Sequence, residues 1–378
     1  MKKLRSALLA LLMMLSLAMP AAAEELAVDA QACLLMEKTT GQVLYAVNEH
    51  EQLEPASVTK VMTLLLVMEA IDSGALSYDD MVTASAYACS MGGSQIWLEE
   101  NEQMTVEDML KAVCVASAND ASVALAEHIA GSAEAFVEKM NQRAAELGME
   151  DTHFVNPTGL PAEGHVTSAY DIALMSRELI LHHPDIRRFT TIWMDSLRDG
   201  AFGLNNTNKL IRYYEGATGL KTGSTDNALY CLSATAERDG MELIAVILKS
   251  PTSTQRFESA KVLLNYGFAA YGLTHIEPEE PLPAIPVELG TAASVMPEVS
   301  GDQDMLLTKD KLGTLTVQTE MEAVLSAPVE KGQRVGTLTV TAGDEVLAEL
   351  PLVAAEGVER LSYGQILLRC LQMAFLGG

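Results

Sequence analysis

The sequence contains few cysteines, and those present form no recognisable framework. The five lie far apart in the chain, at Cys33, Cys89, Cys114, Cys231 and Cys370. No two stand in a C-x-x-C pair or a zinc-ligand spacing, and the seven histidines lack an H-E-x-x-H pattern. An odd, scattered set of this kind predicts buried free thiols instead of disulfide bonds. The sequence therefore predicts neither a metal site nor a bound cofactor.

Basic residues and long apolar runs are scarce as well. Lysine and arginine total 25 against 51 aspartates and glutamates, which gives a formal net charge of -26 and a pI near 4.5. A surface of this charge repels phosphate groups, which argues against a nucleic-acid partner. The apolar run Ala7–Met19 is too short for a helix that spans a bilayer.

The N-terminus has the pattern of a secretory signal peptide. Three basic residues precede the run Ala7–Met19, and the small residues Ala21–Ala23 follow it. We expect residues 1–23 to be removed by cleavage after Ala23. Because this segment holds three basic residues and no acidic one, its removal would change the net charge from -26 to -29. The protein is therefore expected to be exported.

The remaining chain is predicted to form a large α+β domain over residues 24–275. A hairpin is expected near its start, over 32–36 and 43–47, and another near its end, over 229–235 and 243–248, with Asp239-Gly240 in its turn. Helical patterns fill the middle, and 253–271 reads as a closing helix. This order predicts an antiparallel sheet built from both ends of the domain and flanked by helices.

A second, smaller domain is predicted beyond the acidic, proline-rich linker Glu277–Pro283. Short β-patterned runs separated by turn residues indicate an all-β domain over 276–360. The tail, 361–378, is too short to span a membrane but has Gln365, Arg369 and Gln372 on one side of a helix. We expect an amphipathic helix on a membrane surface, with docking on the β domain as the alternative.

Three short motifs carry the chemistry. Ser57 and Lys60 are three residues apart at the start of an apolar helical run, so the hydroxyl and the amine lie on one face. A buried lysine is able to take the proton of a serine nucleophile. Ser117-Ala118-Asn119 interrupts two buried helical stretches, and Lys221-Thr222-Gly223 lies on or beside a strand. The three motifs occur in the order shared by penicillin-binding proteins and β-lactamases.

With these motifs, the chain resembles the serine-type D-alanyl-D-alanine carboxypeptidases, the low-molecular-weight penicillin-binding proteins. The resemblance rests on segments spread over the mature chain, namely Pro55–Lys60, Ser117–Ala121, Asn156–Leu160, Gly219–Gly223 and Ala327–Gln333. It implies a β-lactamase/transpeptidase-like catalytic domain. It further implies an exported enzyme that removes the terminal D-alanine from peptidoglycan pentapeptides, limits cross-linking and binds β-lactams covalently. The family often has a C-terminal amphipathic anchor, which would hold the enzyme on the outer face of the cytoplasmic membrane.

The residue types predict a role for each position. Ser57 is the expected nucleophile and forms the acyl-enzyme, while Lys60 is the expected base, with a pKa lowered by burial and by Lys221. Ser117 is expected to relay a proton among Lys60, Ser57 and the leaving amine. Asn119 is expected to hydrogen-bond the amide of the substrate.

The third motif is expected to hold the end of the substrate. Lys221 and the Thr222 hydroxyl are predicted to bind the terminal carboxylate, and the family resemblance adds Arg256. Gly223 is expected to leave room for the substrate backbone. The N–H groups of Ser57 and Ser224 are expected to stabilise the oxyanion.

Two other readings have to be distinguished from this one. A class A-like β-lactamase shares the motifs but needs a further glutamate to activate water, and no glutamate between Ser117 and Lys221 stands in a Glu-x-x-Leu-Asn context. A non-enzymatic β-lactam- or peptidoglycan-binding module usually lacks the nucleophile or the base, both present here. Endopeptidase cleavage of cross-links and the preferred third residue of the stem peptide stay open.

Overall fold

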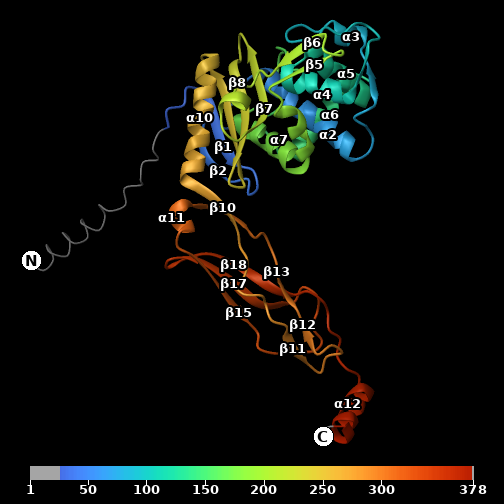
Figure 1. Ribbon diagram of the computed structural model, residues 1–378, viewed down its shortest axis with the longest axis vertical. Helices are drawn as coiled ribbons and strands as arrows, with labels where there is room; N and C mark the ends of the chain where they lie inside the picture. Colours follow the sequence, from blue (N-terminus) through green and yellow to red (C-terminus); the bar gives the residue numbers. More distant parts are fainter. Residues whose placement is uncertain (1–25, 377–378) are drawn as a thin grey trace, which may run out of the picture.

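The computed structural model describes residues 26–376, so the predicted signal peptide, 1–23, lies outside the described residues. Figure 1 shows an α+β domain at one end, a β-rich domain below it, and the helix α12 (Tyr363–Leu376) at the far end. The predicted α+β class with a C-terminal β domain is confirmed.

The α+β domain is organised around a five-stranded antiparallel sheet. Its strand order is β2-β1-β9-β8-β7, with bounds β1 Ala32–Glu37, β2 Val43–Val47, β7 Ala217–Thr225, β8 Leu229–Arg238 and β9 Met241–Ser250. Both predicted hairpins are present. Asp239 and Gly240 have φ values of 51° and 78°, as a tight turn between twisted strands requires. Strands from both ends of the domain thus pair through β1 and β9.

The two faces of this sheet bury separate cores because side chains alternate along a strand. Leu34 and Val246 pack on the side covered by α2 (Lys60–Asp72) and α7 (Ala169–His182). Leu35 and Ile247 pack on the other side, under α10 (Ser253–Ala270). Figure 1 shows α10 along one face and the helical layer on the other. The strand β7 is one of the two edge strands of this sheet, so only β8 pairs with it within the sheet.

The helical layer contains the segments that bear the first two motifs. Its longer members are α5 (Asn119–Ala130) and α6 (Ala133–Glu146), besides α2 and α7. Shorter elements connect them: η1 Ala56–Thr59, β3 Met81–Thr83, α3 Ala86–Cys89, β4 Gln103–Thr105, α4 Val106–Lys111, η2 Ala112–Ala116, η3 Pro184–Ile186, α8 Arg187–Thr190, β5 Met194–Leu197, β6 Phe202–Asn205 and α9 Leu210–Tyr213. Thr105 and Ser168 cap α4 and α7, because their hydroxyls accept from the N–H groups of Asp108 and Asp171.

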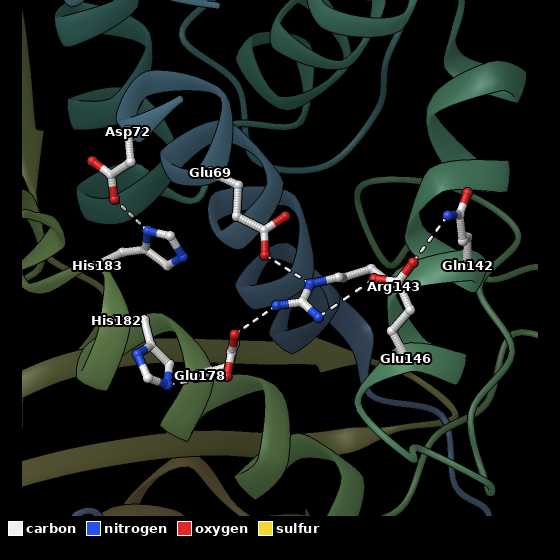
Figure 2. A network of polar contacts seen from close by, with 8 residues as sticks. All are labelled: Glu69, Asp72, Gln142, Arg143, Glu146, Glu178, His182 and His183. Atoms are coloured by element: carbon white, nitrogen blue, oxygen red, sulfur yellow. Dashed lines mark hydrogen bonds and ion pairs between the residues drawn. The ribbon is translucent and has the colours of Figure 1, made fainter. Parts of the chain in front are cut away.

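A polar network ties α2 to its neighbours (Figure 2). Arg143 of α6 donates to Glu69 of α2 at 2.7 Å and to Glu178 of α7 at 2.5 Å. Near the C-terminal end of α2, Asp72 contacts His183, the residue that ends α7, at 2.5 Å. Partly buried, multiply paired charges of this kind fix helices relative to one another more than isolated surface pairs do. The network therefore holds the helix that begins at Lys60.

The C-terminal domain has its own apolar core, separate from the two around the five-stranded sheet. It contains a four-stranded sheet in the order β13-β18-β17-β15 and a three-stranded sheet in the order β12-β11-β16. A third pairing, of β10 with β14, joins the end of α10 to this domain. The bounds are β10 Tyr271–His275, β11 Ile285–Glu288, β12 Ser294–Val295, β13 Pro297–Val299, β14 Asp304–Thr308, α11 Lys309–Leu312, β15 Leu315–Met321, β16 Leu325–Ser326, β17 Arg334–Ala342 and β18 Glu345–Ala354.

The terminal helix α12 packs little against the β domain. Leu367 is 62% exposed, Leu368 57% and Leu371 46%, and the guanidinium of Arg369 donates to the carbonyl of Gly290 at 3.3 Å. Among residues 26–376, no helix combines the length and apolarity that a membrane crossing requires. All five cysteines are free thiols, three of them buried, while that of α12 is exposed.

Candidate active site

Ser57 and Lys60 lie side by side where η1 passes into α2. Ser57 is half-buried, whereas Lys60 is fully buried. The Lys60 amine is 2.9 Å from the Ser57 hydroxyl oxygen. One helical turn thus places a partly exposed hydroxyl within hydrogen-bond distance of a buried amine. A base that is to activate a serine nucleophile must lie at this distance from the hydroxyl.

Two further acceptors surround the Lys60 amine. The side-chain oxygen of Asn119 accepts from it at 2.6 Å, and the carbonyl oxygen of Thr158 accepts at 2.8 Å. A neutral amine has two N–H groups and one lone pair. When Asn119 and Thr158 take the two hydrogens, the lone pair faces the hydroxyl of Ser57. The acceptors therefore orient Lys60 as a base toward this serine.

The environment of Lys60 favours its neutral form. Its pKa is lowered well below the ordinary value, first by burial and then by the positive charge of Lys221, against a smaller opposing effect of Asp120. The pKa of Lys221 is lowered to about 7, mainly because it too is fully buried. Both effects on Lys60 that the sequence predicts are therefore found in the structure.

Ser117 lies closer to Lys221 than to the first motif. Its hydroxyl accepts from the Lys221 amine at 2.8 Å. Ser117 adopts a left-handed backbone conformation, φ 63°, where η2 ends before α5, and this turn brings it to β7. The structure thus shows a contact of Ser117 with Lys221, and the expected proton relay from Ser117 to Lys60 and Ser57 stays a prediction.

Asn119 makes two side-chain contacts that the sequence did not predict, and its predicted hydrogen bond to the substrate stays a prediction. Its amide oxygen is occupied by Lys60, and its nitrogen donates to the carbonyl of Gly92 at 2.6 Å. The amide nitrogen carries a second hydrogen, which remains available for a substrate carbonyl. Asn119 therefore links Lys60 to the loop that contains Gly92.

Gly223 brings β7 against the nucleophile turn. A Cβ atom at this position would lie 2.7 Å from the Pro55 carbonyl oxygen and 2.8 Å from the Ser57 nitrogen. The glycine therefore permits close approach of η1, which is a different reason from the predicted room for substrate. Ser224, the next residue, is exposed, and its expected role beside the Ser57 N–H as an oxyanion donor stays a prediction.

The other predicted binding residues lie around β7. The Thr222 hydroxyl donates to the Thr207 hydroxyl at 2.7 Å. Arg256 reaches from α10 and donates to the carbonyl oxygens of Gly223 at 3.0 Å and Cys231 at 3.1 Å. Arg256 thus contacts the backbone of β7 directly, one residue beyond Thr222, and adds positive charge near Lys221.

The contact between the Thr158 carbonyl and Lys60 was not predicted, although the run Asn156–Leu160 is among the segments that carry the family resemblance. Asn156 accepts from the Gly159 N–H at 2.8 Å and closes the turn. The buried His165 accepts from Val155 N–H through Nδ1 at 3.1 Å, and its Nε2 is 2.8 Å from the Thr59 hydroxyl. The run Asn156–Leu160 was recognisable as a turn, but a backbone acceptor has no side-chain signature.

Comparison with known families gives two matches. The family described as D-alanyl-D-alanine carboxypeptidase matches residues 19–252. The family described as penicillin-binding protein 5, C-terminal domain, matches residues 277–360. Both predicted globular parts of the chain are therefore represented in known families.

Individual relatives agree with these matches. The D-alanyl-D-alanine carboxypeptidase DacF of Bacillus subtilis (strain 168) is 43% identical over 384 residues, which cover 98% of this chain and 98% of the relative. The solved structure of penicillin-binding protein 5 from Haemophilus influenzae has 30% identity and a TM-score of 0.77, covering 90% of this chain and 100% of that chain. Penicillin-binding protein D2 from Listeria monocytogenes, in an ampicillin-bound form, has 33% identity and a TM-score of 0.60, covering 65% and 99%.

Proposed function

This chain belongs to the D-alanyl-D-alanine carboxypeptidases of the low-molecular-weight penicillin-binding protein family, and we propose that Ser57 is the residue through which it acts. It is a serine-type enzyme that hydrolyses the terminal D-Ala-D-Ala bond of peptidoglycan stem peptides. The observation that supports the assignment to Ser57 is the 2.9 Å contact between its hydroxyl and the buried Lys60 amine. No other role explains a fully buried lysine that faces a half-buried serine so well.

In the acylation step, the Ser57 oxygen attacks the carbonyl carbon of the penultimate D-alanine and its proton moves to the Lys60 nitrogen. The C–N bond to the terminal D-alanine then breaks, and the proton held by Lys60 passes to the leaving nitrogen by way of Ser117 and Lys221, whose side chains are 2.8 Å apart, so that Lys60 is neutral again. Water next attacks the ester carbonyl and gives a proton to Lys60. The ester bond breaks, Lys60 returns this proton to the Ser57 oxygen, and the shortened peptide leaves.

The terminal carboxylate of the substrate explains why the enzyme acts at a chain end. Lys221, when protonated, supplies the charge, and the Thr222 hydroxyl supplies a hydrogen bond once it turns away from Thr207, to which it donates in the structure. Arg256 contributes less directly, because its guanidinium contacts the carbonyls of Gly223 and Cys231. An internal peptide bond has no such carboxylate and is rejected because the buried charge would stay unpaired.

Ser57→Ala tests this assignment. We expect the variant to lose both D-alanine release and covalent labelling by a fluorescent penicillin, while its unfolding midpoint stays near that of the wild type, since Ser57 is only half-buried. Full labelling of the variant would refute the role of Ser57. Labelled wild-type protein should also release the penicillin slowly; rapid turnover would favour a class A-like β-lactamase instead.

We further propose that the protein works outside the cell, on the outer face of the cytoplasmic membrane. The exposed leucines of α12, named above, support an interfacial helix more than a docked one, because the β domain leaves them uncovered. Sedimentation with lipid vesicles tests the proposal. The double substitution Leu367→Ser and Leu371→Ser should leave the protein in the supernatant. A wild-type protein that does not sediment with vesicles would refute the proposal of a membrane-surface helix.

A further inference from the structure

Asp120 is a buried carboxylate to which the mechanism above gives no part. It follows Asn119 in the first turn of α5 and has no solvent exposure. Its oxygens accept from the backbone N–H groups of Ile96 at 3.1 Å, Leu98 at 3.1 Å and Ala121 at 2.9 Å. A buried carboxylate fully satisfied by three backbone donors is a strong anchor for the segments that supply them. Asp120 therefore fastens residues 96–98 to the start of α5.

Two of these residues, Ile96 and Trp97, are also held by Arg198, in the turn between β5 and β6. Its guanidinium donates to the Ile96 carbonyl at 2.9 Å and to the Trp97 carbonyl at 3.3 Å, and it pairs with Glu102 at 2.7 Å. Ile96 thus gives its N–H to an acid on α5 and its carbonyl to a base on the hairpin. The segment has charged anchors on both sides.

This anchored segment leads directly to the loop above the catalytic residues. Asn119 donates from its side chain to the Gly92 carbonyl at 2.6 Å and from its backbone to the Ser94 carbonyl at 2.7 Å. The oxygen of the same side chain accepts from Lys60. Neighbouring residues of α5 therefore hold both ends of the loop 92–98, and one of them contacts the base.

We propose that Asp120 is a positioning residue of the reaction, which fixes the loop 92–98 against Asn119 and places a negative charge near Lys60. The inference rests on the proposed role of Lys60 as the base. It adds that the residue after the second motif controls both the geometry and the electrostatics of that base, without touching substrate.

The charged groups around Lys60 define the expected effect. Lys221 faces it from β7 and disfavours its protonated form, while Asp120 on α5 favours that form. Arg256 and Cys114 act on Lys221. Removing the Asp120 charge must therefore lower the pKa of Lys60 further, so that the base becomes neutral at a lower pH.

The experiment compares two substitutions of Asp120 with a control elsewhere. Asp120→Asn removes the charge and keeps the size, whereas Asp120→Glu keeps the charge and displaces it. Asp171→Asn is the matched control, because Asp171 is a buried carboxylate that also holds backbone, accepting from the Asp151 N–H at 2.9 Å, on another helix. The second-order rate of acylation by a fluorescent penicillin is measured between pH 4 and 9, per folded molecule, beside hydrogen exchange of the Ile96 and Leu98 amides.

Asp120→Asn should lower the plateau rate about 10- to 100-fold and move the acid limb about half a pH unit or more to lower pH. Asp120→Glu should lower the plateau without moving the limb, and both should speed exchange at residues 96 and 98. Asp171→Asn should lose stability only. The proposal is overturned if Asp120→Asn keeps the wild-type rate, or if its plateau falls while the limb stays in place. A wild-type pH profile with no acid limb would count against Lys60 as the base. In that case, faster amide exchange at residues 96 and 98 in the Asp120 variants would still show that Asp120 anchors this segment.

Discussion

Gly159 gives the sharpest test of how the loop 156–160 supports the nucleophile. This glycine has φ +80°, and a Cβ atom placed on it would lie 1.8 Å from the Ala56 carbonyl oxygen and 2.8 Å from the Thr59 hydroxyl. Real Cβ contacts are essentially never shorter than 3.0 Å. Gly159→Ala must therefore separate the loop from η1 by more than about 1 Å, and displacements of that size at a catalytic group cost roughly 100-fold in rate.

Gly164→Ala is the matched control for this substitution. Gly164 lies in the same loop region with the same φ, +80°, but its added Cβ would find its nearest neighbour, His153, at 4.0 Å. Both variants therefore share a left-handed backbone penalty of about 1–2 kcal/mol, and only Gly159→Ala displaces the nucleophile turn. The assay is the rate of acylation by a fluorescent penicillin, normalised to folded protein. Equal rates for the two variants would refute the reasoning.

Three other changes have defined outcomes. Lys221→Ala should reduce kcat/KM roughly 100-fold, because it removes both the carboxylate contact, which raises KM, and the proton route to the leaving nitrogen, which lowers kcat. The wild-type kcat/KM should decline above pH 7 because the pKa of Lys221 is about 7; a flat alkaline profile contradicts this. The pKa of His165 is lowered to about 4 by burial, so the unfolded state binds its proton first as the pH falls below about 6.5. The wild type should therefore lose about 2 kcal/mol of stability between pH 7 and 5 relative to His165→Gln, as measured by urea unfolding; identical losses would be inconsistent with a buried neutral histidine. Arg143→Met should destabilise by about 1–3 kcal/mol, since it leaves the carboxylates of Figure 2 unpaired, whereas Lys261→Met, in an exposed pair, should change the urea midpoint little.

The arrangement of the catalytic domain was predictable because its signals are local. Alternating strands, the turn Asp239-Gly240 and the capping residues Thr105 and Ser168 each specify structure over a few neighbours. The five-stranded sheet could be predicted from the two hairpins, because hairpins at both ends of one domain bury their apolar faces by joining in one sheet. The β domain was likewise indicated by turn residues between short apolar runs.

Parts of the site depend on contacts that leave no mark in a sequence. The acceptor at Thr158 is a backbone carbonyl, so any residue there would supply it. Ser117 contacts Lys221 because its backbone has a left-handed conformation, which serine seldom adopts. No neighbouring residue in the sequence predicts this conformation. Gly223 was recognised as a point of close approach, but the partner that approaches it, η1, is known only once the strands and helices are placed together.

The central claim is that one hydroxyl, activated by a buried amine, cleaves the last bond of a D-Ala-D-Ala peptide. The direct measurement is mass spectrometry of diacetyl-Lys-D-Ala-D-Ala digested by the wild type and by Lys60→Met. The account predicts the loss of a single alanine with the wild type and an unchanged peptide with the variant. A variant that removes alanine as fast as the wild type would contradict the claim.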